Sequence, residues 1–329
     1  MTFSEYMQEW LYGEDGYYKT FKAIGKEGDF YTAVSTSAFF GASIASYLYK
    51  QISSGKLPKS VALVEIGAHQ GYLLGDMIRW LYTQDESLLN SMRFIIIERQ
   101  EQVIEAQKAY FSENFGDAVT IEYYQSLTDL ELENAFFVSN EIFDAFPCDL
   151  FKDGKIAVVN EHKINWQDAK LLDLEFAKKH RLKTGEIARG YEEFAKEVAN
   201  AAKSFEFVSF DYGEKYIRND FSIRVYSKHK TYPLFDEELI LSEHYKKSDI
   251  TYDVNFAHVI EAFENAGCTL VKYQTQARAL VEFGIIDILE QYHKLATQAQ
   301  YLAQADKVKT LIAPTIMGDR FKLVHFRKG

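Results

Sequence analysis

The sequence predicts an α/β protein whose core is a Rossmann-like, mostly parallel sheet of seven strands. Two observations carry this prediction: short apolar runs alternate with segments of helical spacing, and a glycine-containing turn follows the first run. Apolar runs bounded by turns are typical of buried parallel strands, and their alternation with helices is typical of a sheet covered on both faces. Hydrophobic residues make up 47% of the 329 residues, which is enough for a substantial core.

The first part of the chain predicts a helical cap ahead of the core. Residues 4–12 carry apolar side chains at helical spacing, and a second helix is expected over residues 37–53, where a Ser-Ser-Gly run and a proline would end it. We therefore expect an N-terminal helical cap over residues 1–57 and a core over residues 58–329.

Within the core, each expected strand is a short apolar run with a turn or a helix after it. Core helices are expected where apolar residues return to helical spacing, at 73–81, 103–111 and 255–266. The expected strands are 61–66, 94–98, 119–124, 135–140, 205–210, 269–273 and 321–326.

Two insertions are expected in the core, near residues 150–204 and 278–310. The Asp153-Gly154 pair lies between two apolar segments and predicts a hairpin with a type I′ turn. Residues 170–203 are charged and are expected to be mostly helical, and a further helical stretch is expected over 278–309. The fold class is therefore a parallel α/β core with a helical cap and with helical and hairpin insertions.

The composition limits which classes of partner and which cellular compartment we expect for this protein. The net charge of −11 and the absence of a dense basic patch argue against nucleic acid, whereas an acidic protein suits a cationic substrate. The sequence has no apolar run of 18 residues, so we expect no membrane insertion. Two cysteines without a CxxC motif, and an N-terminus unlike a secretory signal, predict a cytoplasmic protein.

The turn after the first expected strand is the first candidate site. If it were the dinucleotide fingerprint G-x-G-x-x-G starting at Gly67, the second and third glycines would fall on His69 and Tyr72, so that fingerprint fails. The failed count argues against a Rossmann oxidoreductase that uses NAD.

The same turn fits the pattern of S-adenosylmethionine (SAM) sites. That pattern has an acidic residue two positions before the first glycine and a closing glycine four positions after it, and Glu65 and Gly71 satisfy both. The glycines let the backbone approach a ligand closely, and the acid can hold the cationic amino end of SAM. The alternative is an ordinary strand-to-helix turn.

Glu98 is the second candidate, at the end of the second expected strand. It lies 27 residues after Gly71, the length of one strand–helix–strand unit. A carboxylate at this position can accept hydrogen bonds from both ribose hydroxyls of a nucleoside cofactor. The alternative is a solvated acid at the end of a strand.

The segment 139–147 follows the fourth expected strand and carries the catalytic candidates Asn140, Glu141 and Asp144. Ligands of parallel sheets bind beyond the carboxyl ends of the strands. If the turn is helical, Glu141 and Asp144 would project together and could hold a guanidinium group. The alternative is a capping turn in which Asn140 or Asp144 binds backbone amides.

Across most of its length the chain resembles the MidA-like family, which comprises bacterial and mitochondrial methyltransferases linked to assembly of respiratory complex I. The most specific matching motif is the run Asn-Glu-x-x-Asp-Ala-x-Pro that starts at Asn140. Further matching motifs are 28–32, 63–67 with Gly71, 211–213, 224–226 with His229, 249–251 and 254–256.

This resemblance implies a SAM-dependent protein arginine methyltransferase whose partner is a protein substrate, such as a complex I subunit, and whose N-terminal helices act as a lid. Catalytic roles are expected for Asn140, Glu141 and Asp144. The motifs and the resemblance together assign Glu65, Gly67, Ala68, His69, Gly71, Glu98 and Asn140 to the cofactor, and Asp29, Phe30, Tyr31, Thr32, Asp211 and Tyr212 to the substrate pocket or lid.

Two departures from the family pattern fall in the cofactor site. The family has Gly-Pro-Gly-x-Gly at the loop, and here His69 replaces the middle glycine, while Arg99-Gln100 replaces a Ser-Pro pair. If the backbone at His69 requires a positive φ, a histidine is less favourable there than glycine. Two further alternatives stay open: a non-catalytic assembly factor that keeps the fold, and a small-molecule methyltransferase. We find no metal-ligand spacing and expect no metal site.

Overall fold

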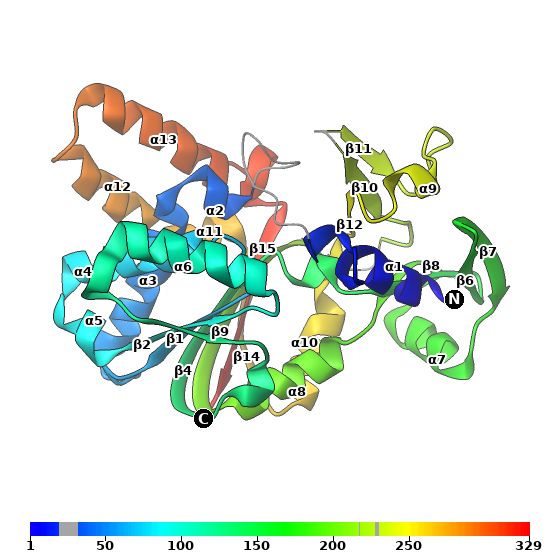
Figure 1. Ribbon diagram of the computed structural model, residues 1–329, viewed down its shortest axis with the longest axis horizontal. Helices are drawn as coiled ribbons and strands as arrows, with labels where there is room; N and C mark the ends of the chain where they lie inside the picture. Colours follow the sequence, from blue (N-terminus) through cyan, green and yellow to red (C-terminus); the bar gives the residue numbers. More distant parts are fainter. Residues whose placement is uncertain (20–31, 217, 228–229) are drawn as a thin grey trace. The chain divides into compact units, whose positions relative to one another are not determined.

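The structure is a computed structural model that describes residues 1–19, 32–216, 218–227 and 230–329 (Figure 1). The chain forms two compact units. We call residues 31–141, 195–211 and 263–329 the large-sheet unit, and residues 1–30, 142–194 and 212–262 the small-sheet unit.

The large-sheet unit is built on a mostly parallel sheet whose strand order is β14-β15-β9-β4-β1-β2-β3. Four neighbouring pairs from β3 to β9 are parallel, and β14 is antiparallel to β15. The predicted Rossmann-like α/β class is confirmed. The strands are β1 (Ala62–Ile66), β2 (Arg93–Ile97), β3 (Ile121–Tyr124), β4 (Leu132–Asn140), β9 (Ala202–Glu214, of which residues up to 211 belong to this unit), β14 (Thr269–Thr275) and β15 (Phe321–Lys328).

The strand order places a topological switch beside β1. The chain runs from β1 outward to β2 and β3, then returns to β4 on the opposite side of β1. In open parallel sheets the carboxyl ends of the strands on either side of such a switch form the ligand site. The loops after β1, β2 and β4 are therefore the expected location of a cofactor in this unit.

Helices pack against this sheet, and α3 is the most enclosed of them, with Phe40, Ile44 and Leu48 fully buried. It packs against α4, α11 and α12, and α6 packs against β3 (Figure 1). The helices of this unit are α2 (Ala33–Thr36), α3 (Ala38–Ser53), α4 (Tyr72–Gln84), α5 (Ser87–Ser91), α6 (Glu101–Phe115), α11 (Gln276–Phe283), α12 (Ile285–His293) and α13 (Gln298–Ile312). Two more, α8 (Tyr191–Ala201) and α10 (Phe256–Asn265), have residues in both units.

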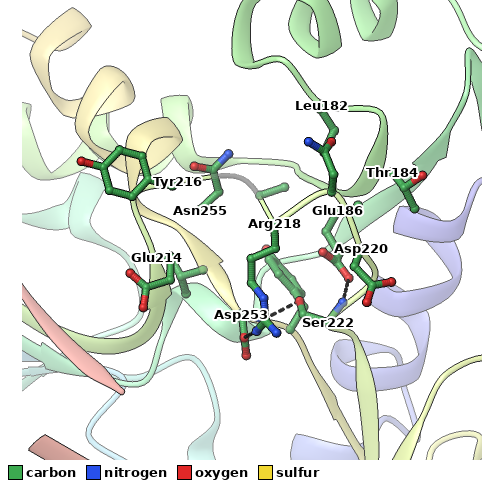
Figure 2. Close-up of a pocket in the computed structure, with 15 residues that line it drawn as sticks. Leu182, Thr184, Glu186, Glu214, Tyr216, Arg218, Asp220, Ser222, Asp253 and Asn255 are labelled. Atoms are coloured by element: carbon green, nitrogen blue, oxygen red, sulfur yellow. Dashed lines mark hydrogen bonds and ion pairs between the residues drawn. The ribbon is translucent and has the colours of Figure 1, made fainter. Parts of the chain in front are cut away.

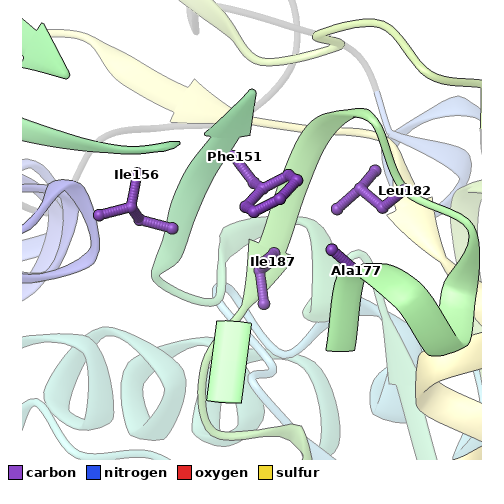
Figure 3. Close-up of a cluster of buried hydrophobic side chains, with 5 residues drawn as sticks. All are labelled: Phe151, Ile156, Ala177, Leu182 and Ile187. Carbon is purple, nitrogen blue, oxygen red and sulfur yellow. The ribbon is translucent and has the colours of Figure 1, made fainter. Parts of the chain in front are cut away.

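The small-sheet unit holds two antiparallel sheets, ordered β7-β6-β5-β8 and β11-β10-β12. Phe151, Ile156, Ile187 and the helical Ala177 belong to its apolar cluster, which Figure 3 shows. Its elements are α1 (Phe3–Tyr12), β5 (Cys148–Lys152), β6 (Lys155–Asn160), β7 (Lys163–Asp168), α7 (Leu171–His180), β8 (Thr184–Ala188), β10 (Arg224–Ser227), β11 (Lys230–Pro233), α9 (Leu241–His244), β12 (Asp249–Thr251) and β13 (Val254–Asn255).

The predicted hairpin is confirmed, because β5 and β6 pair around Asp153 and Gly154, which have φ of +46° and +80° as a type I′ turn requires. The prediction that 170–203 is mostly helical is confirmed by α7 and α8, and the strand β8 (Thr184–Ala188), which pairs with β5, lies between them. The helical stretch over 278–309 is divided at Gly284, whose φ of +101° ends α11.

The two compact units do not follow the predicted division of the chain into a cap over residues 1–57 and a core from residue 58. Helix α3 lies in the same unit as the large sheet, whereas α1 lies with the inserted strands. The assignment of the N-terminal helices to a lid stays a prediction. In the described residues, no helix combines the length and the apolar character that a bilayer span requires.

Candidate cofactor and acceptor site

The loop after β1 turns through three residues with positive φ: Gly67 (+71°), His69 (+46°) and Gly71 (+79°). Its ends are fixed by backbone hydrogen bonds, because Gly67 N donates to Ile97 O at 3.3 Å and Gly71 N donates to Ala68 O at 2.7 Å. A Cβ atom at residue 71 would lie 2.8 Å from Phe111 Cε2. Position 71 therefore requires glycine for both its φ and its space.

The backbone at His69 has the positive φ at which a histidine was expected to be less favourable than glycine, because it lies in the left-handed region. The carbonyl oxygen of His69 accepts a hydrogen bond from Gln107 Nε2 of α6 at 2.7 Å, and Gln107 is fully buried. Gln107 could not be predicted from the sequence, because a single amide on the buried face of a helix belongs to no motif.

Glu65 is buried in β1 and supports the start of α4. Its Oε2 accepts the backbone N–H of Leu74 at 3.0 Å. Leu74 is the third residue of α4, and the residue at the N-cap, Gly71, has no side chain that could cap the helix. Glu65 thus supplies the acceptor that a capping side chain would provide. Burial raises the pKa of Glu65 to about 8, against a hydrogen bond from Leu74 that lowers it.

We predict that the two substitutions of Glu65 differ in their effect on folding. Glu65→Ala removes the acceptor for Leu74 and should lower the free energy of unfolding by about 1–2 kcal/mol, whereas Glu65→Gln keeps a neutral acceptor. The folded protein retains the Glu65 proton up to about pH 8, but an ordinary glutamate releases it near 4.5. Wild-type stability should therefore fall relative to Glu65→Gln as the pH rises from 5 to 8.

Urea unfolding of the cofactor-free protein at both pH values measures this difference. If the gap between wild type and Glu65→Gln stays the same at pH 5 and pH 8, the protonated buried carboxyl is excluded.

Glu98 directly follows β2 and is half-buried, and burial raises its pKa. Gln100 N donates to Glu98 Oε1 at 3.1 Å. The register of the sheet pairs Ile66 with Ile97, so Gly67 and Glu98 leave neighbouring strands at the same edge. This arrangement brings together two of the predicted cofactor positions, as a nucleoside ligand would require.

At the end of β4, the side chains of Asn140 and Glu141 are hydrogen-bonded to each other. Asn140 Nδ2 donates to Glu141 Oε1 at 2.8 Å, and because a carboxylate only accepts, this contact fixes which way the amide points. The buried Asn140 Oδ1 then receives no hydrogen bond from any described residue. Glu141 has φ of +53° and its N–H donates to Phe210 O at 2.8 Å. Backbone strain of this kind clusters at ligand sites.

The expected helical turn that would align Glu141 with Asp144 is not formed. Glu141 is in the left-handed region, and the short 3-10 helix starts only at Phe143 (Phe143–Ala145). Asp144 is buried in the small-sheet unit, where its Oδ2 accepts a hydrogen bond from Tyr212 Oη at 2.7 Å. Burial raises the pKa of Asp144 to about 6. Two predicted site residues, Asp144 and Tyr212, are therefore in contact.

Other predicted residues have structural contacts of their own. Thr32 caps α2, since its Oγ1 accepts from Ser35 N at 3.1 Å, and Asp211 is fully buried in β9. Tyr212 Oη also lies 2.5 Å from Thr251 Oγ1. The predicted residues Asp29, Phe30 and Tyr31 lie outside the described residues.

The described residues contain no group of three or more His, Cys, Asp or Glu side chains that could hold a metal ion.

A separate hollow of about 50 Å³ lies in the small-sheet unit. Figure 2 shows Arg218 directed at Asp253, with 3.0 Å between Nη1 and Oδ2, and Glu186 beside Ser222, whose N–H donates to Oε1 at 2.7 Å. These two pairs satisfy each other's polar groups, and the volume suits a few waters rather than a cofactor.

The model of a protein family described as "Putative S-adenosyl-L-methionine-dependent methyltransferase" matches residues 43–274, which is most of the chain. The chain belongs to this family. The match includes the loop after β1, Glu98 and the segment that starts at Asn140, and it confirms the MidA-like resemblance and S-adenosyl-L-methionine as the cofactor.

Curated relatives are similar over parts of their length. The Xenopus tropicalis mitochondrial protein arginine methyltransferase NDUFAF7 is 28% identical over 172 residues, 45% of this chain and 39% of the relative. The mitochondrial NDUFAF7 homologue of Caenorhabditis elegans is 23% identical over 296 residues, 79% and 67% of the two chains. The match to the Xenopus relative thus spans well under half of that protein's length.

Two crystal structures from Burkholderia thailandensis have the same fold. One is a superfamily member bound to S-adenosyl-homocysteine, with a TM-score of 0.83 and 22% identity over 100% of this chain and 88% of that chain. The second, a native structure, has a TM-score of 0.79 and 21% identity over 100% and 87% of the two chains. At this identity the similarity extends to the fold alone.

Proposed function

We propose that this methyltransferase transfers the methyl group of SAM to an arginine side chain of a protein. The observation that carries the proposal is the acceptor pair after β4. Asn140 Oδ1 is buried and receives no hydrogen bond from the described residues, and Nδ2 of the same amide contacts the carboxylate of Glu141. A guanidinium group offers five N–H donors and a positive charge, so it satisfies both acceptors. The NDUFAF7 relatives, named as arginine methyltransferases, support this choice of acceptor.

The residues around the β1 loop fit a SAM molecule. Gly67 and Gly71 give the loop its left-handed turns, Glu98 offers carboxylate oxygens for ribose hydroxyls, and Glu65 stabilises the start of α4. SAM supplies a methyl group on a positively charged sulfur. The chain's task is then chiefly to hold the guanidinium nitrogen in line with that methyl group.

In this proposal Asn140 and Glu141 bind and orient the guanidinium group. A guanidinium ion is fully protonated near neutral pH, so the nitrogen that gains the methyl group must lose one proton. As the new C–N bond forms and the S–C bond breaks, that proton passes to the Glu141 carboxylate. The methylated guanidinium keeps a single positive charge.

The same proposal includes the partner. It is a protein substrate in the cytoplasm, and a subunit of respiratory complex I is the first candidate.

The test is mass spectrometry of respiratory subunits from cells with and without the gene. We expect an arginine methyl mark that is lost with the gene. The mark should return with the wild-type gene but not with Gly71→Val, because a side chain at 71 would collide with Phe111. Unchanged spectra would favour the non-catalytic assembly factor.

A further inference from the structure

Helix α6 places a fully buried amide beneath the cofactor loop. Gln107 lies on the same helix face as the buried Val103 and Phe111, where apolar side chains otherwise pack. Its Nε2 donates to His69 O at 2.7 Å. Because a carbonyl oxygen only accepts, this contact fixes the orientation of the Gln107 amide.

A buried amide at position 107 is energetically unfavourable unless its hydrogen bond to His69 O has a role. With Nε2 on His69 O, the buried Oε1 of Gln107 receives no hydrogen bond from any described residue. A methionine or leucine would fill the same volume without an unsatisfied oxygen. The carbonyl of His69, however, belongs to a loop residue with φ of +46°, outside any strand or helix, so it needs a donor from elsewhere.

We propose that Gln107 is a positioning residue for SAM, which acts by holding the backbone of His69 in its left-handed conformation. Glycine adopts this conformation without a steric penalty, whereas histidine does so less readily. Gln107 thereby compensates for the histidine at position 69, and it keeps the loop in the conformation that receives the cofactor. The inference concerns cofactor binding and is independent of the identity of the methyl acceptor.

The test is the dissociation constant of SAM, measured by titration calorimetry on the purified protein. Gln107→Met keeps the volume and removes the donor, and we expect SAM to bind about tenfold more weakly, or about 1.4 kcal/mol. In a His69→Gly background the same substitution should weaken binding by no more than about threefold, because glycine needs less support at this φ. The matched control is Gln102→Met, on an exposed position of the same helix, which should leave binding unchanged.

Two results would overturn the proposal: unchanged SAM affinity in Gln107→Met, or equal losses in the wild-type and His69→Gly backgrounds. Thermal unfolding of the cofactor-free variants checks that they fold. If Gln107→Met does not fold, Gln107→Glu replaces it, since a carboxylate has similar shape but cannot donate. Its SAM affinity relative to wild type should recover as the pH falls and the acid regains a proton that it can donate to His69 O. Failure to recover would also contradict the proposal.

Discussion

Glu141→Gln is expected to lower the rate of methyl transfer by about 100-fold while SAM affinity stays within about twofold. Removing one partner of a buried, hydrogen-bonded charge pair costs about 2–5 kcal/mol, and in this proposal Glu141 holds the guanidinium group and receives its proton. The cofactor loop has its own supports in Glu65 and Gln107, which the substitution does not touch. Turnover is measured with labelled SAM on the acceptor that mass spectrometry identifies, and affinity by calorimetry.

The matched control is Glu133→Gln, the same substitution near the start of β4, the strand that Glu141 follows. Its side chain is 74% exposed and pairs with Lys203 at the surface, so turnover and SAM affinity should both match wild type. Equal losses of turnover and SAM affinity in Glu141→Gln would mean that Glu141 supports the loop rather than the acceptor. Unchanged turnover would remove Glu141 from the reaction.

The core was predictable because its signals are local. The short apolar runs before Gly67 and Glu98 mark β1 and β2, and the glycines at 67 and 71 have the positive φ values that the motif implies. The strand β8 was missed because it lies between two charged helices, and only its pairing with β5 makes it a strand. Local propensity cannot register such a long-range partner.

The site was predictable as a set of positions but not as a set of contacts. The sequence motif brought Glu141 and Asp144 together if the turn between them is helical. The left-handed backbone at Glu141 breaks that turn, and Asp144 contacts Tyr212 instead, 68 positions along the chain. Gln107 could not be predicted for the same reason, because its proposed role depends on a tertiary contact with the carbonyl of His69.

The strongest stability effect is expected at Glu206, which is buried at the centre of a polar network in the large-sheet unit. Its Oε2 accepts from Tyr47 Oη at 2.7 Å and from His325 Nε2 at 3.1 Å, and its Oε1 accepts from Arg327. Glu206→Gln removes the charge that these donors surround, so the free energy of unfolding should fall by about 3 kcal/mol. Urea unfolding at pH 7 measures this loss.

Glu282 provides the matched control, because it also accepts hydrogen bonds from three side chains: Lys272, Gln274 and Arg278. Its side chain is 33% exposed, against 3% for Glu206. Glu282→Gln should therefore cost no more than about 1 kcal/mol. Equal losses for the two substitutions would mean that burial does not determine the contribution of Glu206.

The pH dependence separates the charge of Glu206 from its packing. Burial alone would raise the pKa of Glu206, but the contacts with His325, Tyr47 and Arg327 outweigh it and lower the pKa to about 2 from an ordinary value of 4.5. A lowered pKa in the folded state means that the contribution is complete above pH 4.5 and is lost as the pH falls toward 2. The stability gap between wild type and Glu206→Gln should therefore shrink over this interval, because both side chains are then uncharged. A gap that is as wide at pH 2.5 as at pH 7 would assign the loss to altered packing around Tyr47 rather than to the buried charge.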